Sequence, residues 1–310
     1  MFKNATVFRI ATGFALPPLA ALEEALQSAK FLPCGPTQTE SSGWIAPRGN
    51  KSAVLAEAVG GTSVILRLQT ERRAVPASAI KDAVDALVEK YKQETGRERV
   101  GAKIKKEFKE EALQTLLPRA FPKRSAVTLW LDPVNHWVVV DSGSLTGADK
   151  VVSDLIEVLA GIPGAMGGFV AKPLATIMAP GAAMAHWLAS RDAPYRFTLD
   201  RDCELKMPND QKSTVRYSRH TLEIDEVAEH ITAGKMPTQL SMTWNERVSF
   251  ALNDMGHIGK IKLLDVVLDA KDKAGQDDDG FDADAAIVTG ELTALIPDLI
   301  EALGGEVITE

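Results

Sequence analysis

Residues 126–142 read AVTLWLDPVNHWVVVDS, and this stretch gives the clearest indication of the fold. Two runs rich in β-branched and aromatic residues, 126–132 and 136–142, flank Pro133-Val134-Asn135. Such runs on either side of a short turn predict a β-hairpin. We therefore expect an antiparallel pair of strands here, to which the elements on both sides are added.

The chain before this hairpin contains both strands and helices. TVFRI (6–10) and TSVILRLQ (62–69) predict strands, whereas LPPLAALEEALQSAKF (16–31) predicts a helix. From Val75 the pattern becomes helical, and Gly96 and Gly101 separate two helices. Their apolar residues recur at helical spacing: Ile80, Val84, Leu87, Val88 and Tyr91 in the first helix, Ile104, Phe108 and Ala112 in the second. A helical pair inserted between strand-rich segments is typical of an exposed protrusion.

The chain after the hairpin alternates in the same way. A helix near 147–160 is followed by GIPGAMGGF (161–169), the best candidate for a junction between domains. Further strands are expected at 195–206, 213–218, QLSMTWN (239–245), RVSFALN (247–253) and AAIVT (285–289), with helices at 224–233 and from 290 to Gly304-Gly305. Mixed elements without a regular alternation predict an α+β fold.

The composition narrows the class of protein. With 310 residues, 45% of them hydrophobic, the chain is long enough for about two domains. No apolar run of about 18 residues occurs and the N-terminus does not resemble a signal peptide, so we expect a soluble, cytoplasmic protein without membrane contact. The two cysteines, Cys34 and Cys203, are expected to be reduced.

Positive charge is concentrated in one part of this acidic chain. The formal net charge is -7, yet residues 97–124 contain nine Lys and Arg against four acidic residues. Such an asymmetry favours contact with a polyanion, and a basic patch is the electrostatic footprint of a nucleic-acid-binding protein. A solvated helical face is the alternative interpretation. The cations of this stretch are Arg97, Arg99, Lys103, Lys105, Lys106, Lys109, Arg119, Lys123 and Arg124.

Catalytic and cofactor motifs are mostly missing. The chain has no P-loop, no G-x-G-x-x-G, no G-x-S-x-G and no H-E-x-x-H sequence, so we predict no catalytic residue, cofactor or metal. The acidic run AGQDDDGFDAD (274–284) is the exception to be tested, because clustered carboxylates bind Mg²⁺ in nucleases. A metal-dependent nuclease that uses the 277–284 carboxylates, Asp282 among them, is therefore an alternative.

Several long stretches together resemble the recombination-associated protein RdgC family. They are collinear and span essentially the whole chain: FKNATVFRI (2–10), PCG (33–35), GWIAPRG (43–49), LLPRAF (116–121), LWLDPVNHWVVVDS (129–142), HITAGKMPTQLSMTWNERVSF (230–250) and FDADAAIVTGELTALIPDLIEALGGE (281–306). The resemblance implies a non-enzymatic protein that binds DNA without sequence preference. It also implies a ring-shaped homodimer that encircles duplex DNA, associates with the nucleoid and restrains RecA-mediated strand exchange.

The resemblance divides the chain into three regions. Residues 1–75 and 118–178 would form a central α+β region, 76–117 a helical tip, and 179–310 a C-terminal α+β base. Dimer contacts are implied at the tip and the base. Double-stranded DNA is the expected partner, with single-stranded DNA as an open alternative.

Further site residues follow from this resemblance. Phe121 would be the dimer gate, although an ordinary core or interface aromatic is an equally simple interpretation. Arg119 would be a phosphate contact or an interface ion-pair partner. In the base, the basic stretch with Lys212, Arg216 and Arg219 would also contact DNA. A module that binds the recombinase directly, with incidental DNA contact, is a further alternative.

Overall fold

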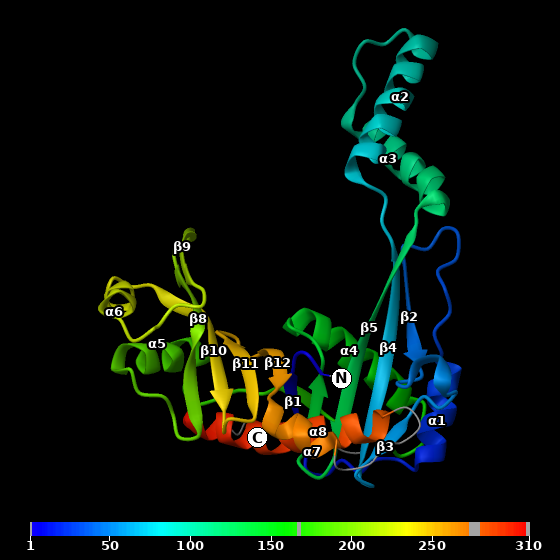
Figure 1. The fold of residues 1–310 in the computed structure, drawn as a ribbon. Coiled ribbons are helices and arrows are strands. Elements are labelled where there is room, and N and C mark those ends of the chain that lie inside the picture. Colours follow the sequence, from blue (N-terminus) through cyan, green and yellow to red (C-terminus); the bar gives the residue numbers. More distant parts are fainter. Residues whose placement is uncertain (1, 166–168, 273–279, 308–310) are drawn as a thin grey trace. The chain divides into compact units, whose positions relative to one another are not determined.

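The computed structural model of the chain describes residues 2–165, 169–272 and 280–307. The described residues form a mixed α+β fold with two antiparallel sheets and eight α-helices (Figure 1). The α+β class predicted from the sequence is therefore confirmed. The proposed junction at 161–169 and the acidic run at 274–284 lie partly outside the described residues.

The chain divides into two compact units. Unit 1 consists of Met1–Ala25, Ala46–Leu66 and Val127–Glu310, and unit 2 of Leu26–Ile45 and Arg67–Ala126. Two long strands, β4 (Ser63–Arg73) and β5 (Pro122–Asp132), run from one unit into the other. The first sheet has the strand order β2-β4-β5-β6-β1-β7, and β3 also pairs with β4.

In unit 1, the first sheet is built around the predicted hairpin. β5 pairs with β6 (Trp137–Val140), which pairs with β1 (Thr6–Ile10), and β1 pairs with the short β7 (Ala171–Pro173). All four residues of β6 are buried, as their β-branched and aromatic composition predicts. The remaining elements of this part are β3 (Glu57–Val59), η1 (Gly49–Lys51), most of α1 (Leu19–Ser28), and α4 (Leu145–Ala160), whose Ser144 side chain accepts a hydrogen bond from the Gly147 N–H.

A second sheet in unit 1 has the order β12-β11-β10-β8-β9. Its apolar residues, among them Leu240 and Trp244, share one core cluster with residues of α5 and α8. The reciprocal backbone hydrogen bonds between Ala5 and Ile258 join it to the first sheet. The strands of this sheet and the helices of the same part of the chain are α5 (Pro180–Ser190), β8 (Phe197–Met207), β9 (Asp210–Tyr217), α6 (Asp225–Thr232), β10 (Met236–Trp244), β11 (Val248–Asn253), β12 (Ile258–Leu263), α7 (Asp265–Asp272) and α8 (Phe281–Ala302).

One predicted strand is wrong. AAIVT (285–289) lies inside α8 and not in a sheet. Ala285, Val288 and Thr289 are buried together with Leu292, and this spacing of three and four residues is helical. Packing of this face therefore overrides the strand preference of the β-branched residues. The helix ends where the sequence predicts, because Gly304 and Gly305 both have positive φ.

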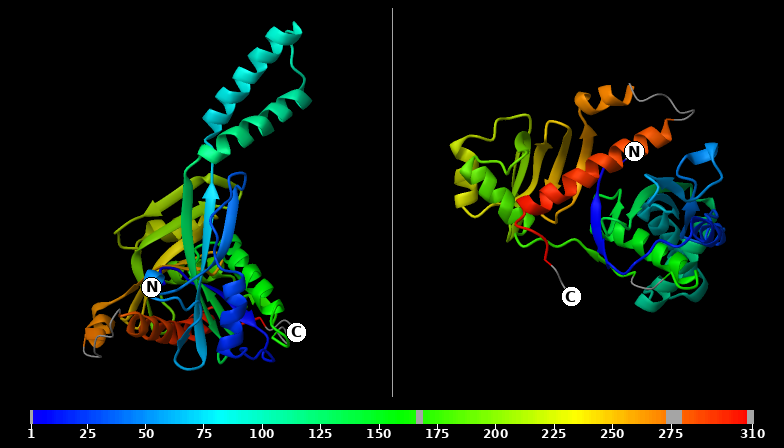
Figure 2. Two further views of the ribbon diagram at one scale, coloured as in Figure 1. Left: turned by 90° about the vertical axis from the view of Figure 1, so that its right-hand side faces the viewer. Right: turned by 90° about the horizontal axis from the view of Figure 1, so that it is seen from below.

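Unit 2 carries the predicted helical pair. It contains β2 (Glu40–Ile45), paired with β4, followed by α2 (Ala77–Thr95), α3 (Ala102–Leu116) and the 3₁₀ turn η2 (Leu117–Arg119). α2 ends at Gly96 in the left-handed conformation, and α3 begins after Gly101. Figures 1 and 2 show α2 and α3 side by side as a helical hairpin, which leaves β4 and returns into β5.

One glycine is required by a close approach in unit 2. A Cβ at Gly43 would lie 2.4 Å from the Cα of Phe31. The chain runs along β2 at this point, because Phe31 N–H donates to Trp44 O and Trp44 N–H donates to Ala29 O. Gly43 therefore permits segment 29–34 to lie against β2.

Candidate nucleic-acid interface

The helical hairpin presents most of its surface to solvent. No residue of α2 is buried, and Ala112 is the single buried residue of α3. The two helices contact each other through their apolar stripes, for example where Tyr91 and Phe108 meet edge to face with ring centroids 5.8 Å apart. Each stripe is therefore covered only in part.

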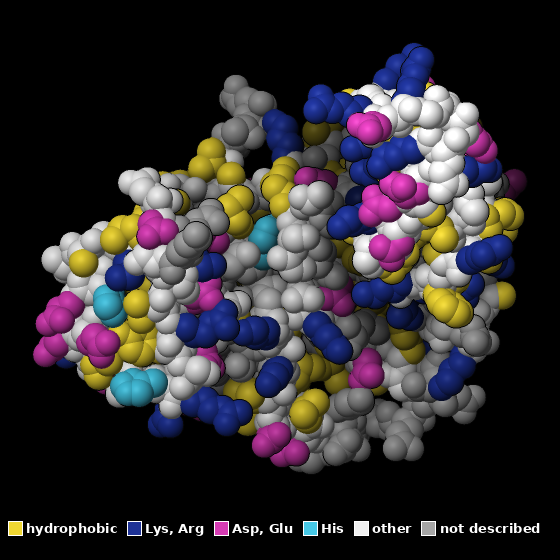
Figure 3. All heavy atoms as spheres, turned by 90° about the horizontal axis from the view of Figure 1, so that it is seen from above, with side chains coloured by type: hydrophobic (Ala, Val, Ile, Leu, Met, Phe, Trp, Pro, Cys, Tyr) yellow, Lys and Arg dark blue, Asp and Glu magenta, His cyan; other side chains and the backbone are white. Residues whose placement is uncertain are grey.

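The cations predicted on the hairpin are all exposed. Arg97 and Arg99 lie in the loop between the helices, and the others lie on α3. Within the described part of the chain, none of them forms an ion pair, whereas Lys90 and Lys92 of α2 pair with Glu94 and Glu89. Figure 3 shows Lys and Arg side chains on the end of the hairpin, interleaved with acidic ones. The unpaired cations are Arg97, Arg99, Lys103, Lys105, Lys106 and Lys109.

The positive charge continues where the hairpin returns to the sheet. Arg119 and Lys123 are exposed and, as far as the structure describes the chain, have no acidic partner. Phe121 lies between them and is 93% exposed. The interpretation of Phe121 as a core aromatic is therefore wrong, because the described residues leave its side chain almost fully exposed. Its interpretation as an interface aromatic stays a prediction. An exposed aromatic beside two free cations remains available to a partner.

Arg124 differs from its neighbours because it is bound to a buried acid. Its Nε donates to the Glu71 carboxylate at 2.7 Å, and its guanidinium lies 5.7 Å from the centre of the Phe31 ring. The Glu71 side chain is 1% exposed, whereas that of Arg124 is 54% exposed. The hydrogen bond from Arg124 holds the pKa of the Glu71 carboxyl below its ordinary value, against the opposing effect of burial. Glu71 is thus an anion that fixes Arg124 at one end of its guanidinium.

Cys34 and Arg73 complete the surroundings of Glu71. The Cys34 N–H donates to the Glu71 carboxylate at 2.9 Å, and its thiol donates to the Glu71 carbonyl. Burial, followed by the charge of Glu71, raises the pKa of the Cys34 thiol. Arg73 donates to the carbonyls of Cys34 and Pro118, each at 3.4 Å. The buried thiol therefore bonds to the backbone of β4, and its raised pKa disfavours the nucleophilic thiolate.

In unit 1, the three predicted base cations differ in their surroundings. Arg216 forms an ion pair with Glu204, which also pairs with Lys206. The hydrogen bond from Lys206, and then that from Arg216, lower the pKa of Glu204 to about 2 although burial opposes them. The backbone N–H of Arg219 donates to Asp202, and its side chain is exposed. Lys212 belongs to β9, but its side chain lies outside the description.

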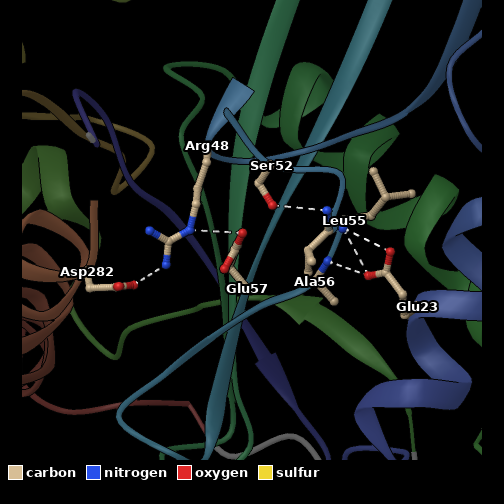
Figure 4. Close-up of polar contacts among 8 residues, drawn as sticks. Glu23, Arg48, Ser52, Leu55, Ala56, Glu57 and Asp282 are labelled. Atoms are coloured by element: carbon tan, nitrogen blue, oxygen red, sulfur yellow. Dashed lines mark hydrogen bonds and ion pairs between the residues drawn. The ribbon is translucent and has the colours of Figure 1, made fainter. Parts of the chain in front are cut away.

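The acid considered for a nuclease site has a different partner. Asp282 pairs with Arg48, whose Nε lies 3.0 Å from Glu57 (Figure 4). The Arg48 guanidinium also lies over the Phe281 ring, 4.6 Å from its centre. This ion pair connects the start of α8 to the loop before β3. Among the described residues, no group of three or more His, Cys, Asp or Glu side chains is placed to hold a metal ion.

The sequence did not point to Glu71 and Arg73. Glu71 lies in the strand β4, in a run of charged residues that gives no sign of burial. Its partners Cys34 and Arg124 are 37 and 53 residues away along the chain.

Among the described residues, no helix combines the length and the apolar character that a membrane span requires.

Comparisons with known proteins agree in one family. The family model described as "RdgC: Putative exonuclease, RdgC" matches residues 1–306. A "Recombination-associated protein RdgC" of Dechloromonas aromatica is 39% identical, with 99% of this chain and 98% of that protein covered. Proteins of the same name from Herminiimonas arsenicoxydans and a Janthinobacterium species are 38% and 37% identical, with 98% and 99% of this chain and 98% of each relative covered.

Proposed function

This chain belongs to the RdgC family, and on that premise we propose that it binds DNA without sequence preference, encircles the duplex as a dimeric ring and restrains RecA-mediated strand exchange. The family name supports a role in recombination. The observation that carries the proposal is the row of exposed, unpaired cations from Arg97 to Lys123 in unit 2.

Phosphate contact explains both the binding and its lack of sequence preference. A Lys or Arg that neutralises a phosphate releases a condensed counterion, so affinity falls steeply as salt rises. Phosphate contacts fix the position of a protein on DNA but do not distinguish base pairs. Cations already paired with carboxylates, such as Lys92 and Arg216, would have to give up that partner first. The unpaired cations of the hairpin and of 119–123 are therefore the proposed contacts.

The hairpin also supports the proposal of a dimer. Ile80, Val84, Leu87 and Val88 on α2 are only half-buried in this single chain. An amphipathic helix normally buries its apolar stripe, and contacts between subunits do so as well as contacts within one. We propose that the hairpin of a second copy covers this stripe. Phe121 would contribute to the same or an adjacent contact.

A ring would add a topological contribution to binding. Once closed around DNA, it leaves only by opening an interface or by sliding off an end. The protein should therefore dissociate more slowly from a covalently closed circle than from the same DNA after linearisation. Equal dissociation rates from both forms, at a salt concentration where binding is reversible, would refute encirclement.

The proposed contacts are tested by removing charge from α3. Each lost phosphate contact lowers the slope of log affinity against log salt by about 0.9 on duplex DNA, so Lys105→Gln/Lys106→Gln/Lys109→Gln should lower it by about 2.7. The matched control is Lys90→Gln/Lys92→Gln, which removes paired lysines of the same hairpin. An unchanged slope in the triple variant, or an equal change per residue in the control, would refute these contacts.

A further inference from the structure

One cluster in unit 2, centred on the buried Cys34 and Glu71, holds both ends of segment 119–123. We call it the root cluster, and it consists of Phe31, Cys34, Glu71, Arg73 and Arg124. It lies at the end of β4, where the chain continues into the helical hairpin, and at the start of β5, where the chain returns from it. All its contacts are within unit 2.

Arg73 holds the first end of the segment. Its guanidinium donates to the carbonyl of Pro118, the residue immediately before Arg119, and also to the carbonyl of Cys34. Its backbone N–H donates to Thr39 O at 2.8 Å, so the residue itself is fixed in the sheet. One side chain therefore connects the end of η2 to the loop that carries Cys34.

Glu71 holds the second end. Its carboxylate accepts from Arg124, the residue immediately after Lys123, and from the backbone of Cys34. Both ends of the segment are thus attached to the same loop, through Cys34. That loop lies against β2 because Gly43 leaves room for the backbone of Phe31.

Between these two ends the segment is held through its backbone: Arg119 belongs to η2, the Ala120 N–H donates to Leu117 O, and Lys123 belongs to β5. Arg119, Phe121 and Lys123 are all exposed, and in the described part of the chain their side chains have no hydrogen-bond or ion-pair partner. Its conformation therefore depends on this backbone structure and on the root cluster, whose side chains hold both ends. Fixing it before binding removes ordering entropy from the cost of association.

We infer that Glu71 is a positioning residue, which, with Arg73, holds segment 119–123 in one conformation and so presents Arg119 and Lys123 for contact with DNA. The link to DNA rests on the proposed function, whereas the restraint of the segment does not. Arg124 has two roles in this arrangement. Its Nε binds Glu71, and 54% of its side chain is still exposed to solvent.

Limited digestion with trypsin tests the restraint without DNA. Glu71→Gln keeps the size of the side chain but removes its charge, so cleavage after Arg119 should accelerate on the order of fivefold, as expected for a segment that loses its preorganised conformation. Cleavage after Arg97 and Arg99, in the loop between α2 and α3, is the internal reference and should not change. Arg73→Gln, which releases the other end, should give the same result.

The ratio of the two cleavage rates separates positioning from general destabilisation. Global unfolding would accelerate cleavage at every site, whereas release of the segment raises the ratio of cleavage after Arg119 to cleavage after Arg97 and Arg99. An unchanged ratio in both variants would overturn the inference. Glu23→Gln is the matched control, because the Glu23 carboxylate also accepts backbone hydrogen bonds, from Leu55 and Ala56 in unit 1 (Figure 4).

DNA affinity then tests the functional part. Glu71→Gln should weaken duplex binding in the otherwise unchanged protein and have no further effect in Arg119→Gln/Lys123→Gln, because the contacts that it positions are already lost. Additive losses would overturn the positioning role. If the trypsin ratio rises but Arg119→Gln/Lys123→Gln binds DNA like the unchanged protein, the restraint is supported and the DNA contact of this segment is overturned.

Discussion

Gly43→Ala should destabilise unit 2 because a methyl group at this position has no room. The new Cβ would lie 2.4 Å from Phe31 Cα, 2.5 Å from Phe31 N and 2.8 Å from Lys30 C, and all three are backbone atoms. Rotation of a side chain cannot relieve these contacts, so segment 29–34 must move away from β2. Overpacking of this kind costs about 1–3 kcal/mol, and rigid backbone neighbours place Gly43→Ala at the upper end, near 3 kcal/mol.

Urea unfolding, followed by circular dichroism, measures this cost as a lower midpoint. Gly13→Ala is the matched control, since a Cβ at Gly13 meets no atom within 4 Å and the φ of this residue is not positive. The displaced segment carries Cys34, so the Cys34 thiol should also react faster with a thiol reagent in Gly43→Ala. Equal midpoints for the two variants, with an unchanged thiol reactivity, would refute the packing of segment 29–34 against β2.

Three further predictions concern charge and chemistry. The pKa of Glu204 is about 2 in the folded protein against an ordinary value of 4.5, so its contribution to stability is complete above pH 4.5 and is lost as the pH falls towards 2. The difference in urea midpoint between the unchanged protein and Glu204→Gln should therefore shrink over that interval, and a constant difference would contradict it. Burial raises the pKa of the Cys203 thiol to about 12 and also raises the pKa of the Cys34 thiol. Neither thiol should therefore react with a thiol reagent at pH 8 until the protein unfolds. Rapid labelling of the native protein would contradict this prediction. Asp282→Asn removes the ion pair with Arg48. A DNA duplex incubated with Mg²⁺ should stay intact both with the unchanged protein and with Asp282→Asn. Cleavage by the unchanged protein that Asp282→Asn abolishes would establish the nuclease alternative.

The fold could be predicted where local pattern and packing agree. The hairpin at 126–142 consists of two runs rich in β-branched and aromatic residues, and both runs are buried over part of their length. In the glycine-bounded helices of unit 2, the helical spacing of apolar residues matches their half-buried or buried positions. The prediction failed at AAIVT, where local β-branched residues favoured a strand while the apolar spacing over all of α8 is helical. β12, α5 and α7 were not predicted, because short or glycine-rich segments carry too little periodicity.

The candidate site, like the fold, could be predicted from the sequence only in part. Exposure of the four lysines on α3 could be predicted, because an amphipathic helix buries only one side. The pairing of Arg124 with Glu71 could not, because it depends on two strands whose interacting residues are 53 positions apart. Two neighbouring cations of one basic run therefore have different surroundings: among the described residues Lys123 has no ion-pair partner, whereas Arg124 is bound to Glu71. Only tertiary structure separates them.

Binding of the unchanged protein to two unrelated duplexes of equal length, over a salt series, tests the central claim most directly. The account predicts equal affinities for the two sequences and a steep common slope, with a loss of about 3.5-fold per phosphate contact between about 50 and 200 mM salt. A clear preference for one sequence, or an affinity that does not depend on salt, would contradict it.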